Sequence, residues 1–421
     1  MCVLLVIQLL LVGALKGQDN LPVVYNSSEI LEKARLAIED GHLEDALLAY
    51  QQILPQDPAY LQAQLDRSQV LNELGRSAEA IHDLHLLYEN QLIKDEPDHL
   101  IYLASLYIDD SLYVEAAEVL DKVVALTPNH PYLYFILAQL SYRQHDTKAA
   151  FSHLMHSLEL HPNHLQAHSF LGRLCLEEGY IIEGYLALLT AIALNPESEI
   201  SVENVRKLNV RLSNHYLTKT GTLMKTAGTD QFDEIEAVLR NQLPLSAKYQ
   251  LNCDVDEPVT RNIQALLEYS AMHSLKGGFF ERTYMPFLQA IQQGRQGEVF
   301  LYYLLGGFKE DIGKKLKAHA KEVLTFDQSF IQKHAWDYLG RRTVMMDGQS
   351  TQVSVLYEDG FPFLKGPVNK GVKNGHFWLM NRKGQLTGDL QIREDELDGI
   401  QHYYHTNGIH SGWAQWPGES R

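Results

Sequence analysis

The sequence predicts a mainly α-helical chain, in which a solenoid of repeated helix pairs is followed by a helical region and a small C-terminal module of antiparallel β-hairpins. Three observations predict this order. Pro128, Pro162 and Pro196 recur at one interval of about 34 residues, a period typical of stacked helix pairs, and Pro58 lies about two such intervals before the first of them. Small side chains recur at two fixed places in each unit of this repeat. Near the C-terminus, turn-forming dipeptides recur at a second constant interval.

The prolines define five units of one helix pair each, at 27–60, 61–96, 97–130, 131–164 and 165–198. The second unit is longer than the others because the segment QLIKDEP is extended. Two helices can approach closely only where their side chains are small. The eighth and twentieth places of the units hold only Ala, Ser or Gly, at Ala34, Ser68, Ala104, Ala138 and Gly172, and at Ala46, Ala80, Ala116, Ala150 and Gly184. We therefore expect these ten residues at the helix contacts.

The turn within each helix pair is predicted at Gly41, Gly75, Ser111, His145 and Gly179. Glycine can adopt the left-handed conformation that ends a helix at little cost. Large apolar residues recur at helical spacing between these turns, as in Leu36, Leu43, Leu47, Tyr50 and Leu54. On these motifs, residues 27–198 resemble the tetratricopeptide repeat (TPR) family. The resemblance implies an α-solenoid with a concave groove.

The formal net charge of -17 is concentrated in the repeats, because residues 27–198 hold 26 of the 53 acidic residues but only 9 of the 36 basic ones. Such a surface repels nucleic acid and anionic lipid and favours basic partners. The simpler interpretation is that the excess acid keeps a repeat array soluble.

Residues 1–17 are expected to be a signal peptide. An uncharged apolar run from Val3 to Leu15 is too short to span a bilayer but fits the core of a secretory signal, with cleavage after Ala14, although no Lys or Arg precedes it. The mature chain is therefore expected to be exported, either periplasmic or secreted, in a bacterial cell envelope. After cleavage we expect no stable membrane insertion. Cys175 and Cys253 are interpreted as reduced, with Cys175 a small buried side chain.

Residues 199–345 lose the period but keep apolar residues at helical spacing, and LTKTGTLMKTAGT at 217–229 is interpreted as a flexible break. The predicted helices are Val202–Leu212, Gln231–Leu243, Pro258–Leu275, Arg282–Gln292, Val299–Leu305, Asp311–Leu324 and Phe330–Leu339. This region could hold degenerate repeats that continue the solenoid. Alternatively, it is a helical domain that caps the solenoid's end.

Residues 351–421 are predicted to form β-hairpins. The dipeptides Asp359-Gly360, Lys383-Gly384 and Asn407-Gly408 are evenly spaced, and the same interval separates Gly375 from Gly399 and Gly388 from Gly412. The blocks NGHFWLMNRKGQLTG and DGIQHYYHTNGIHSG align without a gap, so each is predicted to be one hairpin that packs on the next. They resemble the MORN-like repeats of bacterial proteins, some of which are described as antitoxin-like. The aromatic residues Trp378, Tyr403, Tyr404, Trp413 and Trp416 could form a binding strip, or cross-strand pairs that hold the sheet together.

No sequence motif for catalysis or for cofactor binding is found, so we expect no catalytic residue, cofactor or metal. The densest histidine group, His153, His156, His161, His164 and His168, is interpreted as surface or capping histidines. Asp254 and Asp256 in CDVDEP lack the glycine and the distal glutamate of a calcium loop, and are interpreted as a turn that begins a helix.

The TPR resemblance implies that the ninth and thirteenth residues of each unit point into the groove. The ninth are Arg35, Gln69, Ser105, Gln139 and Arg173, and the thirteenth are Glu39, Glu73, Asp109, Arg143 and Glu177. Tyr132, Phe135 and Tyr142 add an apolar shelf beside Arg143. These residues predict a groove that binds a basic or amphipathic protein segment. The alternative is that the acids are only a solvated face.

Together these patterns predict a non-enzymatic scaffold for protein–protein interaction, located in the cell envelope and binding no nucleic acid. The second hypothesis is an immunity or antitoxin protein that uses the MORN-like module. A third is an enzyme with its site in residues 199–345.

Overall fold

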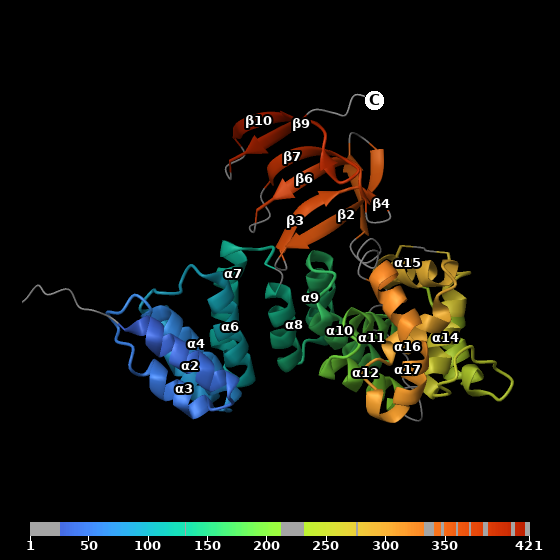
Figure 1. Ribbon diagram of the computed structural model, residues 1–421, viewed down its shortest axis with the longest axis horizontal. Coiled ribbons are helices and arrows are strands. Elements are labelled where there is room, and N and C mark those ends of the chain that lie inside the picture. Colours follow the sequence, from blue (N-terminus) through green and yellow to red (C-terminus); the bar gives the residue numbers. More distant parts are fainter. Residues whose placement is uncertain are drawn as a thin grey trace, which may run out of the picture. The chain divides into compact units, whose positions relative to one another are not determined.

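The structure, a computed structural model, describes residues 26–211, 231–331 and 341–416, apart from gaps at 131, 275–276, 347–348, 359–360, 370–371, 382–385 and 406–408. The expected signal peptide, the segment 217–229 and the three turn dipeptides of the hairpins lie outside the described residues. The chain divides into two compact units, one ending at Leu112 and one beginning at Tyr113. The mainly α-helical fold class with a C-terminal antiparallel sheet is confirmed (Figure 1).

The described part of the first unit holds five helices, which alternate as the first and second members of the repeated pairs. They are α2 (Ser27–Glu39), α3 (Leu43–Tyr50), α4 (Tyr60–Glu73), α5 (Ser77–Glu89) and α6 (Pro97–Asp109). The extension of the second repeat falls in the loop between α5 and α6, where Ile93 is fully buried. Pro97 occupies the first position of α6, where a missing N–H costs nothing.

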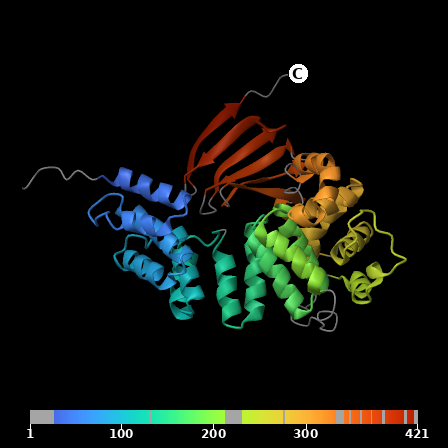
Figure 2. The same cartoon turned by 60° about the horizontal axis from the view of Figure 1, so that its bottom comes forward.

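The second unit begins with five more helices of the same pattern, which run side by side from α8 to α11 (Figure 2). These helices are α7 (Tyr113–Leu126), α8 (Leu133–Arg143), α9 (Thr147–Leu160), α10 (Leu165–Glu178) and α11 (Ile181–Leu194). The helices α6 and α7 of the third repeat therefore belong to different units.

The small residues lie where the sequence predicts them, since all ten are buried. The closest approach is between α10 and α11. A Cβ atom added at Gly172 would lie 2.5 Å from Leu188 Cγ, and one added at Gly184 would lie 2.7 Å from Leu176 Cγ. Glycine is therefore required at both places, because any side chain would push the two helices apart.

The predicted turns are confirmed at every repeat. Gly41, Gly75, Ser111, His145 and Gly179 all have positive φ angles, between 64° and 86°. Ser111 and His145 take this conformation although they carry a Cβ, which shows that the turn geometry is imposed by the helix pair and not by glycine alone. Two of the expected apolar residues are not part of the core, since Leu36 and Leu54 are exposed. Helical spacing alone cannot tell a buried face of a helix from an exposed one.

The middle region continues the helical part with α12 (Glu199–Arg211), α13 (Asp233–Arg240), α14 (Pro258–Ser270), α15 (Phe279–Gln293), α16 (Gly297–Leu304) and α17 (Lys309–Phe326), and with short helical turns at Leu243–Leu245 and Asp327–Ile331. Helices α12, α13, α15 and α16 contact α11. Buried residues between Ala138 and Ile331 pack into one hydrophobic core, in which Tyr185 and Tyr284 are fully buried. The middle region thus covers the face of the fifth repeat that would otherwise be exposed.

The C-terminal module is an antiparallel sheet with strands in the order β1-β2-β3-β6-β7-β9-β10, in which β8 pairs with β7, and β4 and β5 form a separate two-stranded sheet. Its strands are β1 (Arg341–Met346), β2 (Gln349–Glu358), β3 (Phe361–Gly366), β6 (Gly375–Met380), β7 (Leu386–Arg393), β9 (Gly399–Tyr404) and β10 (His410–Trp416), with short strands β4 (Val368–Asn369), β5 (Val372–Lys373) and β8 (Glu396–Leu397). The sheet begins before Thr351, at Arg341. The two aligned blocks form the hairpins β6/β7 and β9/β10, which pair through β7 and β9.

Several glycines of this module are needed for its backbone conformation or its packing. Gly375 and Gly399 both have positive φ, at 111° and 75°. Gly366 lies under the buried ring of Phe377, where an added Cβ would be 2.3 Å from a ring carbon. Two of the five aromatic residues form cross-strand pairs, Trp378 with Lys365 and Tyr404 with His410. Tyr403 lies opposite Gly388 and Gly412, so aromatic rings and glycines alternate across the sheet.

Candidate functional site

In the first unit, the predicted groove residues are exposed, apart from the partly exposed Ser105, but Arg35 is already paired with acids of its own helix. The Arg35 guanidinium forms ion pairs with Glu32, at 2.6 Å, and with Glu39 on the same helix. The hydrogen bond to Glu32 is the main reason that the pKa of Arg35 is raised, and Arg35 in turn lowers the pKa of Glu32. Because its guanidinium group is already paired with Glu32 and Glu39, Arg35 is not available to bind the carboxylate of a ligand.

The acids of this unit share one position in their helices. Glu39, Glu73 and Asp109 are the last residues of α2, α4 and α6, and all three are exposed, as is Gln69. The C-terminus of a helix carries partial negative charge, so a carboxylate there is unfavourable by about 0.3–1 kcal/mol. The Tyr102 hydroxyl, 3.3 Å from the Ser68 carbonyl oxygen, joins α6 to α4 on this side. Helix ends and carboxylates therefore combine into a region of negative potential.

In the second unit, the structure gathers four of the predicted residues around one that the sequence analysis missed. The missed residue is Phe170, on α10. The ring of Tyr142 lies 5.3 Å from its ring and that of Phe135 lies 6.4 Å from it, while the Arg173 guanidinium is 5.6 Å away. The Tyr142 hydroxyl donates to Glu177 at 3.2 Å. Phe170 is the sixth residue of its repeat, one helical turn before the ninth, and so the repeat register did not select it.

We name this group, Phe135, Tyr142, Phe170, Arg173 and Glu177, the aromatic shelf. Tyr142 is exposed, and Arg173 and Glu177 are partly exposed, so the shelf offers an aromatic ring, a cation and a carboxylate to solvent. Arg143, at the end of α8, is exposed, and Gln139 is half-buried. The shelf is thus mixed in charge, unlike the acidic helix ends of the first unit.

Tyr132, the remaining predicted residue, packs on histidines. Its ring lies 5.8 Å from the ring of His161 and 5.0 Å from that of His164, and Phe135 lies 4.7 Å from His164. The rings of His161 and His164 stack at 5.2 Å. These contacts lie at the junction where α9 ends and α10 begins, on both sides of Pro162.

The interpretation of these histidines as surface or capping residues holds for His161 and His164 as cap residues, at the end of α9 and the start of α10, and is wrong for His168, which is buried within α10. His161, His164 and His168 are buried, and burial lowers the pKa of each, to about 4 for His161, about 3 for His164 and about 4 for His168. The two ring nitrogens of His168 lie 2.9 Å from the Tyr284 hydroxyl and 2.7 Å from the Pro162 carbonyl oxygen. The contact with Tyr284 on α15 is between residues 116 positions apart, which no local pattern reveals.

Acidification is expected to destabilise the second unit between about pH 6.5 and pH 4. The folded-state pKa values lie below the ordinary 6.5, so the unfolded chain binds protons first; the stabilisation is complete above pH 6.5 and is lost as the pH falls towards 4. Each unit of pKa difference corresponds to about 1.4 kcal/mol. The thermal unfolding midpoint, followed by circular dichroism from pH 7.5 to 4, should fall more steeply for the wild type than for His164→Phe. Equal slopes would contradict this explanation.

A second buried polar group lies in the middle region. His273 Nε2 is 3.0 Å from Glu281 Oε1, and its Nδ1 is 2.6 Å from the Tyr269 hydroxyl. Glu281 also accepts hydrogen bonds from the backbone N–H groups of Gln231, at 3.1 Å, and Gly277, at 2.9 Å. The side chain of His273 is 6% exposed and that of Glu281 is 0% exposed. This arrangement is closed to a substrate, and it ties two loops to the start of α15.

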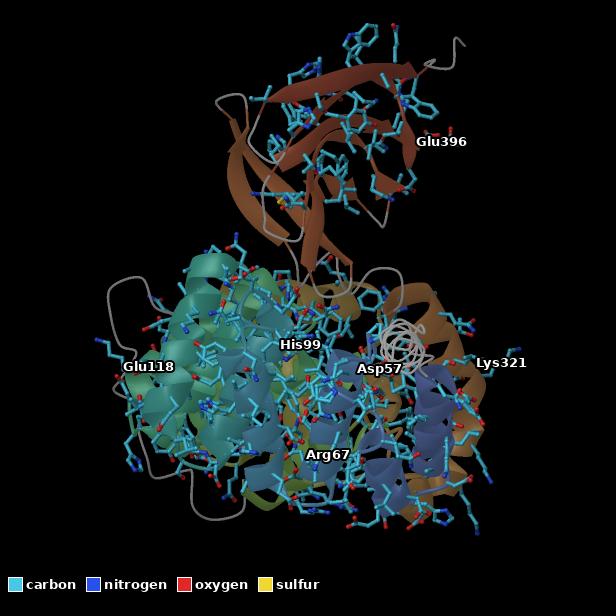
Figure 3. All side chains as sticks on the ribbon, turned by 90° about the vertical axis from the view of Figure 1, so that its left-hand side faces the viewer. Asp57, Arg67, His99, Glu118, Lys321 and Glu396 are labelled. Atoms are coloured by element: carbon cyan, nitrogen blue, oxygen red, sulfur yellow. The ribbon has the colours of Figure 1, made fainter. Side chains whose placement is uncertain are left out.

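The remaining polar features are also structural. The turn around Asp254 begins α14, as predicted: Glu257 and Thr260 form a capping box, and Pro258 is the first residue of the helix. Arg67, labelled in Figure 3, forms a largely buried ion pair with Asp83. Cys175 and Cys253 are buried, and neither is in a disulfide. In the described part of the chain no group of three or more His, Cys, Asp or Glu residues is arranged to hold a metal ion.

Comparison with known proteins defines the class of this chain. A model of the tetratricopeptide repeat family matches residues 31–89, and a model described as anaphase-promoting complex, cyclosome, subunit 3 matches residues 109–191. With the helix pairs and their turns, these matches confirm TPR repeats, and such repeats indicate a scaffold for protein–protein interaction. The matched models do not reach the C-terminal module, so its MORN-like character stays a prediction.

Individual relatives match only part of the chain. ER membrane protein complex subunit 2 of Xenopus tropicalis is 33% identical over 101 residues, which is 24% of this chain and 33% of the relative. Protein O-mannosyl-transferase TMTC1 of Homo sapiens is 25% identical over 194 residues, 44% of this chain and 21% of the relative. The chain thus spans a third or less of the length of these relatives.

The solved structures that are similar to this chain each match less than half of it. TTC0263, a TPR protein of Thermus thermophilus, is 18% identical with a TM-score of 0.37 and covers 43% of this chain and 98% of its own. MamA of Desulfovibrio magneticus RS-1 is 15% identical with a TM-score of 0.35, covering 41% of this chain and 97% of its own. Among the described residues, no helix has both the length and the apolar character needed to cross a bilayer.

Proposed function

We propose that this chain is an exported, non-enzymatic scaffold that binds a basic or amphipathic protein segment through its TPR helices. The observation that carries the proposal is the placement of Glu39, Glu73 and Asp109 at the C-terminal ends of three successive first helices. Carboxylates at these ends do not help the helices, because they add to the negative end of each macrodipole. A cationic ligand would relieve this repulsion, so the arrangement favours binding over stability.

The charge of the ligand follows from the potential that it meets. Glu39 is compensated by Arg35, whereas no ion pair compensates Glu73 or Asp109 among the described contacts. A segment with Lys or Arg can approach these two carboxylates and the carbonyl groups of the helix ends together. Such an attraction is screened beyond about 8 Å at physiological ionic strength, so binding should weaken as salt is added.

The aromatic shelf of the second unit supplies a different kind of contact. Exposed Tyr142 and partly exposed Phe135 provide apolar surface, while Arg173 and Glu177 beside Phe170 provide one charge of each sign. Aromatic residues and arginine are the side chains most often found at the centres of protein interfaces. We propose that the shelf, considered by itself, receives an aromatic or aliphatic side chain of a protein partner. The proposed exported location rests on the apolar run from Val3 to Leu15.

The acidic helix ends are tested by reversing their sign. We expect Glu39→Lys, Glu73→Lys and Asp109→Lys together to weaken binding of a fluorescent amphipathic Lys/Arg peptide by about tenfold or more at low salt. Binding is measured by fluorescence anisotropy at several salt concentrations. The same triple variant should also lose proteins captured by the wild type from an envelope extract.

A matched control carries the same change of net charge elsewhere. Asp45, Glu118 and Asp121 are exposed acids on the second helices α3 and α7, none of them at a helix C-terminus, and Glu118 is labelled in Figure 3. Changing these three to Lys should reduce binding much less. If the two triple variants bind the peptide equally, the inner acids are only a solvated surface and the proposal fails.

A further inference from the structure

Strand β10 forms one edge of the sheet. Among the described residues it pairs only with β9, so the backbone groups of its other side face solvent (Figure 1). Its sequence, HSGWAQW, contains no Lys, Arg, Asp, Glu or Pro. Edge strands of soluble proteins are normally protected by such residues, because an open edge pairs readily with another strand. β10 lacks this protection.

Two tryptophans are exposed on this same strand. Trp413 is 64% exposed and Trp416 is 47% exposed. Successive side chains of a strand point to opposite faces, so residues three apart lie on opposite faces of the sheet. A ligand bound on one face would cover only one of the two rings. A strand added along the edge of β10 would cover both, because its own side chains alternate between the same two faces.

The glycines of the sheet show what such a strand must provide. Tyr403 on β9 lies between Gly388 on β7 and Gly412 on β10. In the gap-free alignment of the two hairpin blocks, Gly412 corresponds to Gly388. Gly388 is flanked on its outer side by Tyr403, whereas a Cβ added at Gly412 would meet no atom within 4 Å. The sheet therefore ends with an open place beside a glycine, where the preceding repeat has an aromatic ring.

Strand β10 itself carries the ring that fits this place. Trp416 lies on the same face as Gly412, and within its own chain it is paired with Gly399. If two β10 strands pair antiparallel with Ala414 on the two-fold axis, Trp416 of each lies opposite Gly412 of the other. Each Trp416 would then lie between two glycines, as Tyr403 does. Trp413 would face Gln415 of the other strand.

We propose that this protein forms a two-fold symmetric dimer in which β10 of one copy pairs with β10 of a second copy about Ala414. The two sheets become one continuous sheet, and the same patch serves on both copies, as closed two-fold interfaces require. Neighbouring registers fit less well. Centring the pair on Trp413 leaves Gly412 opposite Ala414, and centring it on Gln415 moves Trp416 opposite Ala414. A slip that changes parity exchanges the faces of the side chains.

The proposal is tested on the full chain by light scattering coupled to size-exclusion chromatography over a range of concentrations. The wild type should have the mass of a dimer. Trp416→Ala should raise the dissociation constant of the dimer roughly tenfold or more, because a buried tryptophan at an interface is costly to truncate. Leu386→Ala, an exposed residue on β7 away from the edge, should leave the dimer unchanged.

Charged side chains introduced at Ala414, on the proposed two-fold axis, give the decisive test of the dimer. Ala414→Glu and Ala414→Lys should each be monomeric, because like charges would meet at the two-fold axis. Mixed in equal amounts, they should form a heterodimer, which also shows that both variants fold. A monomeric wild type would overturn the proposal, as would a dimer that both Ala414 variants leave intact or a mixture that stays monomeric. A wild type that is monomeric alone but binds an added strand peptide of another sequence would also overturn it.

Discussion

Replacing Glu281 by alanine is expected to lower the free energy of unfolding of the second unit by about 3–5 kcal/mol. The carboxylate is fully buried and is held by His273 and by two backbone N–H groups, those of Gln231 and Gly277. Its removal leaves the buried His273 ring without this partner and takes the acceptor from the two backbone N–H groups, and an unsatisfied buried polar group is costly. Chemical denaturation followed by tyrosine and tryptophan fluorescence gives the stability difference.

The control for this variant is Glu298→Ala. Glu298 is also in the first turn of a helix, α16, but it is exposed. Its replacement should change stability by no more than about 0.5 kcal/mol. If Glu281→Ala were as mild as Glu298→Ala, the buried hydrogen-bond group would not hold the loops before α13 and α15 as we infer.

Introducing a side chain at Gly172 is expected to disrupt the contact between α10 and α11. Because an added Cβ would already lie 2.5 Å from Leu188 Cγ and 3.0 Å from the Gly184 carbonyl oxygen, Gly172→Val forces the helices apart. Overpacking of a core costs about 1–3 kcal/mol and sometimes more, and two further methyl groups place this variant at the upper end. Hydrogen exchange of the peptides covering residues 165–194 should accelerate.

Two further variants separate the effect of steric crowding from the effect of replacing a glycine in a helix. Gly313→Ala, in α17, has no atom within 4 Å of the added Cβ and should raise stability slightly, as alanine favours a helix by up to about 1 kcal/mol over glycine. Adding Leu188→Ala to Gly172→Val should restore part of the lost protection, because it removes the clashing side chain. Without such recovery, the crowding at Leu188 is not the cause.

The sequence was sufficient to predict most of the helical fold, because the information is local and repeated. A helix pair requires a small residue where its helices cross, a residue that accepts positive φ at its turn and apolar residues at helical spacing, and each of these is visible in a single unit. Five units repeat the same pattern. The predicted turns at Ser111 and His145, which lack the usual glycine, were found by register and not by composition.

The candidate site was predicted only in part. The repeat register placed Glu73 and Asp109 on exposed helix ends, yet it did not reveal that Arg35 is engaged by Glu32 and Glu39. Phe170 joins the shelf through contacts between neighbouring repeats, so its role depends on how α8 and α10 pack. Which residue lies opposite each aromatic residue of the sheet depends on strand register, which spacing alone did not give.

By itself, the sequence determined the period, the helix pairs, the positions of close helix contact and the location of the negative charge, since each depends on residues close together in the chain. Only the tertiary structure decided that His161, His164 and His168 are buried, that Glu281 joins two distant loops, and that β10 is left as an open edge. Burial and pairing of this kind arise from segments far apart in the sequence. Their physical cause is the exclusion of water where those segments meet.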